Sequence, residues 1–184
     1  MTLRSLPNAI TGARLVGCLL FACLFARAAY GVALALYVVL ELLDQADGKL
    51  AKALHLETTT GKFFDPFVDS LTHLTAFAAL LSIGVVPLWA LLIFVFREFG
   101  LLFLRLLASL QGTQLGGHWP GKTKALVHAI VVTVCLAVVS GRLRNTLLPL
   151  PIWIDLAATA SVLSGVYYAV RYRAVIERAF AEPS

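Results

Sequence analysis

Long, nearly uninterrupted runs of apolar residues limit the possible folds of this chain more than any other feature. One run extends from Leu15 to Leu43 and another from Phe63 to Phe96. A helix crosses the hydrocarbon core of a bilayer with about 20 apolar residues, so each run is too long for a single crossing. Hydrophobic residues make up 60% of the chain and charged residues only 14%. This balance indicates an integral membrane protein and not a soluble domain.

Short interruptions divide each run into two predicted helices. In the first run, Arg27 with Gly31 just beyond it predicts a tight hairpin. In the second run, the turn residues Gly84 to Pro87 separate a third helix from a fourth, which reaches about Leu110. A polar, glycine-rich connection follows the fourth helix.

Two later apolar segments, Ala125–Ser140 and Ile152–Val170, bring the prediction to six membrane-spanning helices. Residues 1–14 mix apolar and basic side chains and predict an N-terminal interfacial segment. Six spans place both termini on one side of the membrane. Most lysines and arginines fall on that side, although Arg142 and Arg144 do not, and the positive-inside rule makes it cytoplasmic. We therefore expect an all-α membrane protein with residues 1–184 in a single domain.

Four aspartates interrupt the apolar sequence within one short stretch. Asp44 and Asp47 are three residues apart on the predicted second helix, and Asp65 and Asp69 are four apart on the third, so each pair shares a helical face. The short connection between the helices brings both pairs to one depth. Crowded carboxylates need cations, and Mg²⁺ and Mn²⁺ prefer oxygen ligands and bridge to phosphates. We predict a divalent-ion site; a solvated loop with helix-capping aspartates is the alternative.

A cluster of cations follows on the fourth helix and in the connection after it. Arg97 lies among phenylalanines well inside the fourth helix, and a buried arginine needs an anionic partner. Glu98 is adjacent but faces about 100° away around the helix, so we expect it to be a poor partner. A phosphate bound by Arg97, Arg105, Lys122 and Lys124 would compensate the charge. The alternatives are an acidic residue on another helix or snorkelling of the arginine to the interface.

The aspartate stretch resembles the signature of the CDP-alcohol phosphotransferase family, D-x-x-D-G-x-x-A-R-x(8)-G-x-x-x-D-x-x-x-D. All its spacings are present, at Asp44, Asp47, Gly48, Ala51, Lys52, Gly61, Asp65 and Asp69. Lys52 replaces the family's arginine, which keeps the positive charge and loses the bidentate fork. An upstream segment is similar to the family's P-N-x-x-T-x-x-R entry, at Pro7, Asn8, Thr11 and Arg14. Segments similar to the R-E-x(6)-R and G-K-x-K of phosphatidylglycerophosphate synthases supply Arg97, Glu98, Arg105, Lys122 and Lys124.

The resemblance implies that a phosphatidyl group is transferred from CDP-diacylglycerol to glycerol 3-phosphate, releasing CMP. It implies two Mg²⁺ or Mn²⁺ ions on Asp44, Asp47, Asp65 and Asp69, with Asp69 as the catalytic proton acceptor. The residues implied to bind CDP-diacylglycerol are Asn8, Thr11, Arg14, Gly48, Lys52, Thr58 and Gly61. Those implied to bind the acceptor phosphate are Arg97, Arg105, Lys122 and Lys124. It further implies a homodimer among the lipids of a bacterial inner membrane. The distribution of basic residues places the active site towards the cytoplasm, and the modest net charge of +5 predicts no nucleic-acid partner.

Three alternatives stay open at this point. Another alcohol, such as inositol phosphate, serine or a phospholipid, could be the acceptor, because Ser70 follows the last aspartate where glycerol phosphate enzymes often have a lysine. A small cation transporter could use the aspartates as an ion site, although such sites lie near the bilayer midplane and these acids cluster at one interface. His73 shares a face with Asp69 and either orients it, contacts ligand or packs between helices.

Overall fold

The chain folds into a bundle of helices, described by a computed structural model over residues 6–53, 61–113, 115, 118–144 and 146–181. Side chains at 6–9, 46–53 and 61–63 are outside this description. Within these ranges there is no strand, and the helices are α1 (Leu6–Ala26), α2 (Tyr30–Ala53), α3 (Gly61–Ser82), α4 (Leu88–Leu110), α5 (Trp119–Val139), α6 (Leu150–Arg171) and α7 (Arg173–Phe180). The prediction of an all-α fold is confirmed for this part of the chain.

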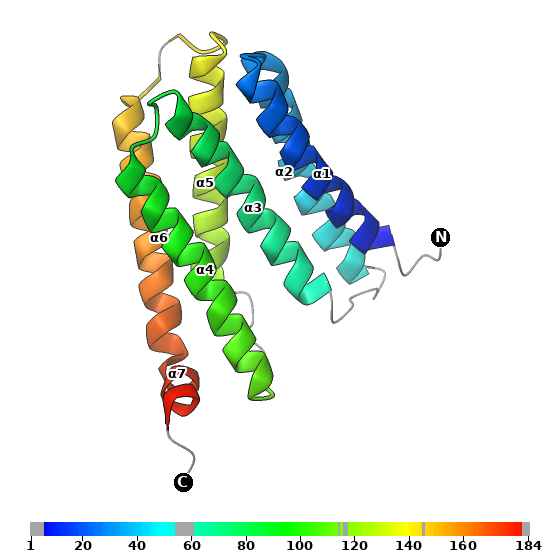
Figure 1. Cartoon of the computed structure of the whole chain (residues 1–184), viewed down its shortest axis with the longest axis vertical. Helices are drawn as coiled ribbons and strands as arrows, with labels where there is room; N and C mark the ends of the chain where they lie inside the picture. The colour runs from blue at the N-terminus through cyan, green and yellow to red at the C-terminus, as the bar shows by residue number, and fades with distance from the viewer. Residues whose placement is uncertain (1–5, 54–60, 114, 116–117, 145, 182–184) are drawn as a thin grey trace.

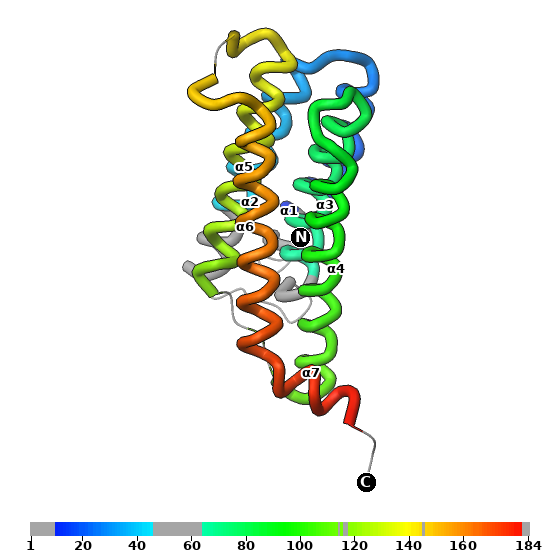
Figure 2. The backbone as a smooth tube through the Cα atoms, turned by 90° about the vertical axis from the view of Figure 1, so that its left-hand side faces the viewer, coloured from blue at the N-terminus to red at the C-terminus, as the bar shows by residue number. Residues whose placement is uncertain are grey.

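The six long helices run alternately up and down the bundle (Figure 1). The α1–α2, α3–α4 and α5–α6 connections lie at its upper end, whereas α2 ends and α3 begins in the lower half. Figure 2 shows the same alternation from the side, with α7 at the lower end of α4 and α6. In the described chain, α1 packs on α2 and α3, while α5 contacts α2, α3 and α6, and α4 contacts α3, α6 and α7. The aspartate-bearing ends of α2 and α3 therefore lie in the same half of the bundle as α7.

Both predicted interruptions are confirmed. α1 and α2 are separated by a short turn that contains Arg27 and places Ala28 at a positive φ of 56°. α3 and α4 are separated by the predicted turn, in which Gly84 has a φ of 76°. Glycine adopts this left-handed conformation without the steric cost of a Cβ. The fixed φ of Pro87 then suits the residue that caps the start of α4.

The structure differs from the predicted helix limits at three places. α5 begins at Trp119 and not at Ala125, because Pro120 stands in its first turn, where a missing N–H costs no hydrogen bond. The C-terminal residues form α7, which lies beyond the last predicted helix. The predicted interfacial segment is not separate from the first span over the described residues, since α1 is continuous from Leu6.

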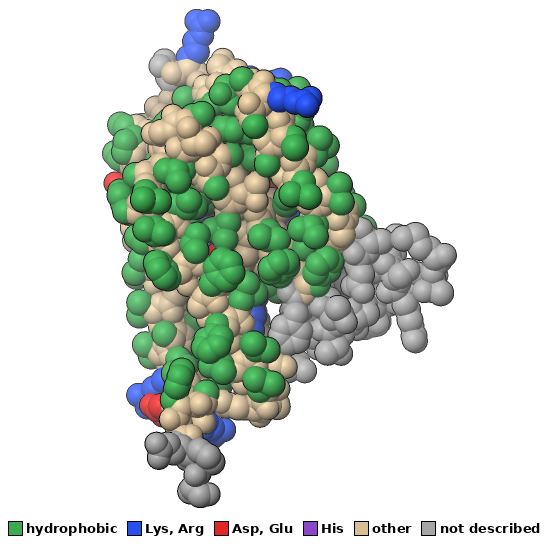
Figure 3. Space-filling view, viewed as in Figure 1, with side chains coloured by type: hydrophobic (Ala, Val, Ile, Leu, Met, Phe, Trp, Pro, Cys, Tyr) green, Lys and Arg blue, Asp and Glu red, His purple; other side chains and the backbone are tan. Residues whose placement is uncertain are grey.

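Among the described helices, α5 and α6 are long and apolar enough to cross a membrane, judged by length and composition. α4 is longer still, but Arg97, Glu98 and Arg105 lie within it. Hydrophobic side chains cover much of the face shown in Figure 3, and lysine and arginine atoms gather mainly towards its two ends. These features are consistent with a membrane protein.

A buried apolar cluster holds the long helices together. It includes Phe21 of α1, Tyr37 of α2, Phe77 of α3, Phe94 of α4 and Leu136 of α5. A second cluster joins α4 to α6 and α7 around residues such as Leu104, Tyr168 and Val175. These contacts fix the relative positions of α3, α4, α5 and α6, which supply most of the polar residues described below.

Candidate active site

One polar cavity of about 250 Å³ gathers most of the described site residues predicted from the sequence. Its carboxylates come mainly from α2 and α3 and its cations from α4 and α5. The charged residues that line it are Asp44, Asp65, Asp69, Glu98, Arg97, Arg105, Lys122 and Lys124. The cavity therefore brings together three of the four predicted aspartates and the four predicted cations, while the fourth aspartate lies outside the described side chains. The cavity has an acidic side and a cationic side, with Glu98 as the one acid that α4 contributes among these lining residues.

Residues of α1 hold the acidic side in place. Thr11 donates a hydrogen bond from Oγ1 to Oδ1 of Asp65 at 2.8 Å. The Nη1 atom of Arg14 lies 2.5 Å from Oδ1 of Asp44, and the Arg14 side chain is fully buried. A buried carboxylate is tolerated when a cation and hydrogen bonds compensate its charge. The two entry residues predicted to bind CDP-diacylglycerol thus contact aspartates directly.

The rest of the predicted nucleotide and metal site lies outside the described side chains. This applies to Asn8, Asp47, Gly48, Lys52, Thr58 and Gly61. Within the described residues, no group of three His, Cys, Asp or Glu side chains is placed to hold a metal ion. The described carboxylates of Asp44, Asp65 and Asp69 line one cavity. Carboxylate oxygens are ligands that Mg²⁺ and Mn²⁺ prefer, so the chemistry of this donor set fits a hard divalent ion.

Glu98 is the centre of the charge network on the other side of the cavity. Its Oε1 atom accepts a hydrogen bond from Nη1 of Arg97 at 2.9 Å and pairs with Nζ of Lys124. Its Oε2 atom accepts a hydrogen bond from Ser70 at 2.6 Å. Nη2 of Arg97 also donates to Ser164 at 2.7 Å. The prediction that Glu98 is a poor partner for Arg97 was wrong, because the long arginine side chain reaches across the angle between adjacent residues.

Two other cations that line the cavity, Arg105 and Lys122, do not pair with Glu98. Arg105 is partly buried and Lys122 is exposed. Neither side chain forms a hydrogen bond or ion pair with another residue of the described chain. Arg97 and Lys124 share the charge of Glu98, so Arg105 and Lys122 are the cavity cations best able to bind an added anion.

The start of α5, which carries both lysines, is fixed against α6. The backbone N–H of His118 donates to the hydroxyl of Tyr168 at 3.2 Å, and its ring Nε2 lies 2.8 Å from the hydroxyl of Tyr172. A Cβ at Gly121 would lie 2.8 Å from the Tyr168 hydroxyl, so the helices approach closely only because this residue is glycine. These contacts could not be predicted from the sequence, because the two tyrosines are about 50 residues away along the chain.

A chain of buried polar groups lies behind Asp69. Nε2 of His73 is 3.4 Å from Oδ1 of Asp69. Nδ1 of His73 is 3.0 Å from the hydroxyl of Tyr37 and 3.6 Å from Oε1 of Glu41. The expected shared face of His73 and Asp69 is confirmed. Tyr37 and Glu41 were not predicted, although their spacing of four on α2 was a signal that they share a face.

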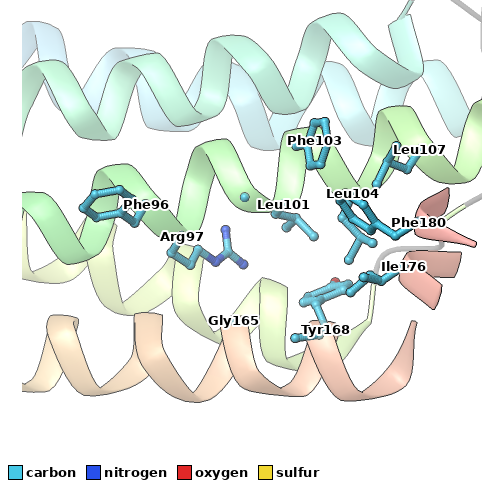
Figure 4. A pocket seen from close by; sticks show the side chains of 12 residues that line it. Phe96, Arg97, Leu101, Phe103, Leu104, Leu107, Gly165, Tyr168, Ile176 and Phe180 are labelled. Atoms are coloured by element: carbon cyan, nitrogen blue, oxygen red, sulfur yellow. The ribbon is translucent and has the colours of Figure 1, made fainter. Parts of the chain in front are cut away.

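An apolar pocket of about 280 Å³ adjoins the polar cavity, between α4, α6 and α7 (Figure 4). Arg97, Leu101 and Tyr168 line both spaces. Figure 4 shows Arg97 projecting from α4 towards Gly165 of α6, and a Cβ at Gly165 would lie 3.6 Å from Cγ of Arg97. At Gly100, a Cβ would meet no atom within 4 Å. The two spaces together suit a ligand with an anionic end and a hydrocarbon end.

Comparison with known proteins agrees with this combination of helices and charged cavity. The model of the CDP-alcohol phosphatidyltransferase family matches residues 4–167, and the chain belongs to this family. It is 32% identical over 101 residues to CDP-diacylglycerol–glycerol-3-phosphate 3-phosphatidyltransferase of Bacillus subtilis, covering 55% of this chain and 52% of that protein. It is 30% identical over 144 residues to a probable phosphatidylglycerophosphate synthase of Mycobacterium tuberculosis, covering 78% of this chain and 67% of that protein.

A third relative carries a different name. The chain is 32% identical over 100 residues to cardiolipin synthase (CMP-forming) of Streptomyces coelicolor, covering 51% of this chain and 46% of that protein. The chain spans about half the length of the Bacillus subtilis relative.

Proposed function

We propose that the chain transfers the phosphatidyl group of CDP-diacylglycerol to glycerol 3-phosphate, giving phosphatidylglycerol phosphate and CMP. The observation that carries the proposal is the cavity in which Asp44, Asp65 and Asp69 lie together with Arg105 and Lys122. An acidic side suits metal-bound pyrophosphate, and a cationic side suits an acceptor that carries its own phosphate. The names of the Bacillus subtilis and Mycobacterium tuberculosis relatives support the same reaction.

In this mechanism the acceptor hydroxyl attacks the phosphorus that bears diacylglycerol. An oxygen–phosphorus bond forms, the bond to CMP breaks, and Asp69 accepts the hydroxyl proton. Arg105 and Lys122 bind the acceptor phosphate and hold the hydroxyl in line, while Glu98 keeps Arg97 and Lys124 in the cavity wall. Two Mg²⁺ or Mn²⁺ ions on Asp44, Asp47, Asp65 and Asp69 would neutralise charge on the pyrophosphate.

The proposed donor site extends into the part of the chain outside the described side chains. Thr11 and Arg14 orient Asp65 and Asp44. The cytidine diphosphate end would lie over these residues together with Asn8, Gly48, Lys52, Thr58 and Gly61. Mg²⁺-dependent binding of CMP would support this site, and it would oppose the alternative of a cation transporter.

The proposed enzyme spans the membrane six times with both termini in the cytoplasm. Each helix from α1 to α6 has 21 to 24 residues. At 1.5 Å per residue such helices can cross a core of about 30 Å. The basic residues Arg171, Arg173 and Arg178 lie at the end that carries α7, which favours a cytoplasmic position for that end. A bacterial inner membrane and a homodimer complete the proposal.

CMP release by the purified protein tests the proposed reaction. The assay contains CDP-diacylglycerol and Mg²⁺ with glycerol 3-phosphate, inositol phosphate, serine or free glycerol as acceptor. We expect release with glycerol 3-phosphate alone. Release with another alcohol would overturn the acceptor and keep the transferase chemistry. Folded protein that releases no CMP with any alcohol would overturn the proposed activity.

Replacing Arg105 with glutamine should lower kcat/KM for glycerol 3-phosphate by about 10- to 100-fold, since a hydrogen bond to a charged group contributes roughly 1.5–3 kcal/mol. The loss should appear mainly in the KM for the acceptor, with the KM for CDP-diacylglycerol little changed. Arg144→Gln is the control, because Arg144 is exposed and lies in the α5–α6 connection at the other end of the bundle. Equal acceptor kinetics in both variants would remove Arg105 from the phosphate site.

Gly100→Leu should fill the apolar pocket, which we assign to one acyl chain of the donor. Excluding two methylene groups would cost about 1.6 kcal/mol at roughly 0.8 kcal/mol each, which corresponds to a KM increase of about tenfold. The increase should appear with dioleoyl CDP-diacylglycerol and be small with the dioctanoyl form. Ala78→Leu adds the same bulk at an exposed position on α3, outside the pocket. If Gly100→Leu has the same effect on both chain lengths, the pocket does not hold an acyl chain.

A further inference from the structure

The buried side of the polar cavity contains a histidine that the proposed reaction does not use. We propose that His73 is a positioning residue, which holds the carboxylate of Asp69 towards the cavity, and that Tyr37 sets the orientation of the His73 ring. The inference rests on the proposed function for the role of Asp69 in proton transfer. Its structural basis is the contact sequence from Tyr37 of α2 through His73 to Asp69 of α3.

The hydrogen-bonding capacities of the three groups determine the direction of each contact. Nε2 of His73 lies 3.4 Å from Oδ1 of Asp69 without hydrogen-bond geometry. An ionised carboxylate can only accept, so closing this contact into a hydrogen bond requires the ring form with its proton on Nε2. With its proton on Nε2, the ring presents the lone pair of Nδ1 to the hydroxyl of Tyr37, which donates to it at 3.0 Å. Oε1 of Glu41 lies 3.6 Å from Nδ1, too far for a hydrogen bond. Glu41 also interacts with the Tyr37 hydroxyl, so the inference requires that this hydroxyl donates to Nδ1 and thereby favours the ring form that can hold Asp69.

The surroundings of His73 leave its ring little freedom to turn. The side chain is 1% exposed and Tyr37 is fully buried. The ring of His128 packs on it edge to face, with centroids 5.7 Å apart, and Nε2 of His128 lies 2.7 Å from the hydroxyl of Ser161. Groups from α2 and α5 thus contact a ring that belongs to α3, and α6 in turn holds the ring of His128. A functional side chain is held accurately when packing and hydrogen bonds fix its supporting groups.

Holding Oδ1 of Asp69 on the buried side leaves the other carboxylate oxygen for the cavity. Arg105 and Lys122 line the same cavity and would attract a carboxylate that could turn freely. His73 therefore prevents Asp69 from pairing with the cations that we assign to the acceptor phosphate. Its effect should appear in kcat and in the affinity of the acidic side for a divalent ion, and not in the KM of either substrate.

Three variants of the full-length protein test the first part of this inference. His73→Leu removes the hydrogen bond with Tyr37 and the Nε2 contact with Asp69, whereas His73→Gln places an amide N–H near the position of Nε2. Thr72→Val is the control: it changes a buried polar neighbour on α3 that bonds to Cys18 and to the backbone of Val68 and not to Asp69. His73→Leu should lower kcat for CMP release about 10- to 100-fold, as loss of an outer-shell partner typically does. His73→Gln should recover at least tenfold of that loss, and Thr72→Val should keep the wild-type kcat.

Binding of Mn²⁺ alone, followed by electron paramagnetic resonance, gives a readout that does not depend on turnover. The Kd for Mn²⁺ should rise about tenfold in His73→Leu and return towards wild type in His73→Gln. If the three proteins show these Mn²⁺ affinities but the wild type releases no CMP, the proposed function is overturned and the role of His73 in holding Asp69 is supported. Unchanged kcat and Mn²⁺ affinity in His73→Leu, or no recovery in His73→Gln, would overturn the inference.

The role of Tyr37 is tested by a double-mutant cycle. Tyr37→Phe should lower kcat a few-fold in the wild-type background and cause no further loss in His73→Leu, because the hydroxyl acts only through the imidazole. Equal losses from Tyr37→Phe in both backgrounds would show that the hydroxyl acts independently, and would overturn its assignment as the group that orients His73.

Discussion

Asp69→Asn should lower kcat for CMP release by about 10²- to 10⁴-fold, the range attributed to a positioned general base. Asparagine has nearly the same shape and can still contact His73, but it cannot take the proton of the attacking hydroxyl. Asp69 lines the polar cavity together with Asp65, and its Oδ1 atom lies 3.4 Å from Nε2 of His73. The substitution therefore removes the proposed proton acceptor and leaves its surroundings in place.

The measurement compares kcat at saturating CDP-diacylglycerol and glycerol 3-phosphate, together with thermal unfolding of each protein in the same detergent. Asp155→Asn makes the same chemical change at an exposed position on α6, away from the cavity, and should keep the wild-type kcat. A folded Asp69→Asn variant that retains more than a tenth of the wild-type kcat would contradict the assignment of Asp69 as the proton acceptor.

The acidic side of the site could be predicted because its geometry is local. Spacings of three and four residues fix which side chains share a helical face, so Asp65 and Asp69 had to point the same way once α3 formed. α1 packs on both α2 and α3, and Asp44 of α2 lines the same cavity. The hairpin at Arg27 was predictable for a similar reason, since a charged residue inside a run too long for one span marks its midpoint.

The residues of the cationic side could be predicted from the sequence, but their hydrogen bonds and ion pairs could not. Glu98 joins Arg97, Lys124 and Ser70, which come from three different helices. Such a contact depends on how the helices pack and on rotamers of long side chains, neither of which follows from periodicity. The start of α5 was missed because the glycine-rich stretch before it suggested a loop. Its first turn is instead stabilised by contacts with tyrosines of the distant α6.

Glu98→Gln should cause the largest loss of stability among substitutions in the cavity. The carboxylate is 4% exposed and compensates two cations, of which Lys124 is 2% exposed. Removing one partner from a buried ion pair costs roughly 3–5 kcal/mol, because the remaining charge stays buried without compensation. Glutamine keeps the size of the side chain and can still accept a hydrogen bond, so the loss reports on charge. Unfolding of the purified protein measures it, with Glu177→Gln on the exposed face of α7 as the control.

A second substitution distinguishes a loss of charge balance from a loss of packing. Lys124→Met keeps most of the apolar stem and removes one of the two cations, so in the Glu98→Gln background it should restore part of the lost stability. In the wild-type background it should cost less than Glu98→Gln does, because Arg97 and Ser70 still satisfy the carboxylate. If Lys124→Met lowers the stability of Glu98→Gln further, the carboxylate stabilises the bundle through its shape and hydrogen bonds. Recovery would show that Glu98 is needed to keep cations in the wall of a cavity that must also bind an anionic substrate.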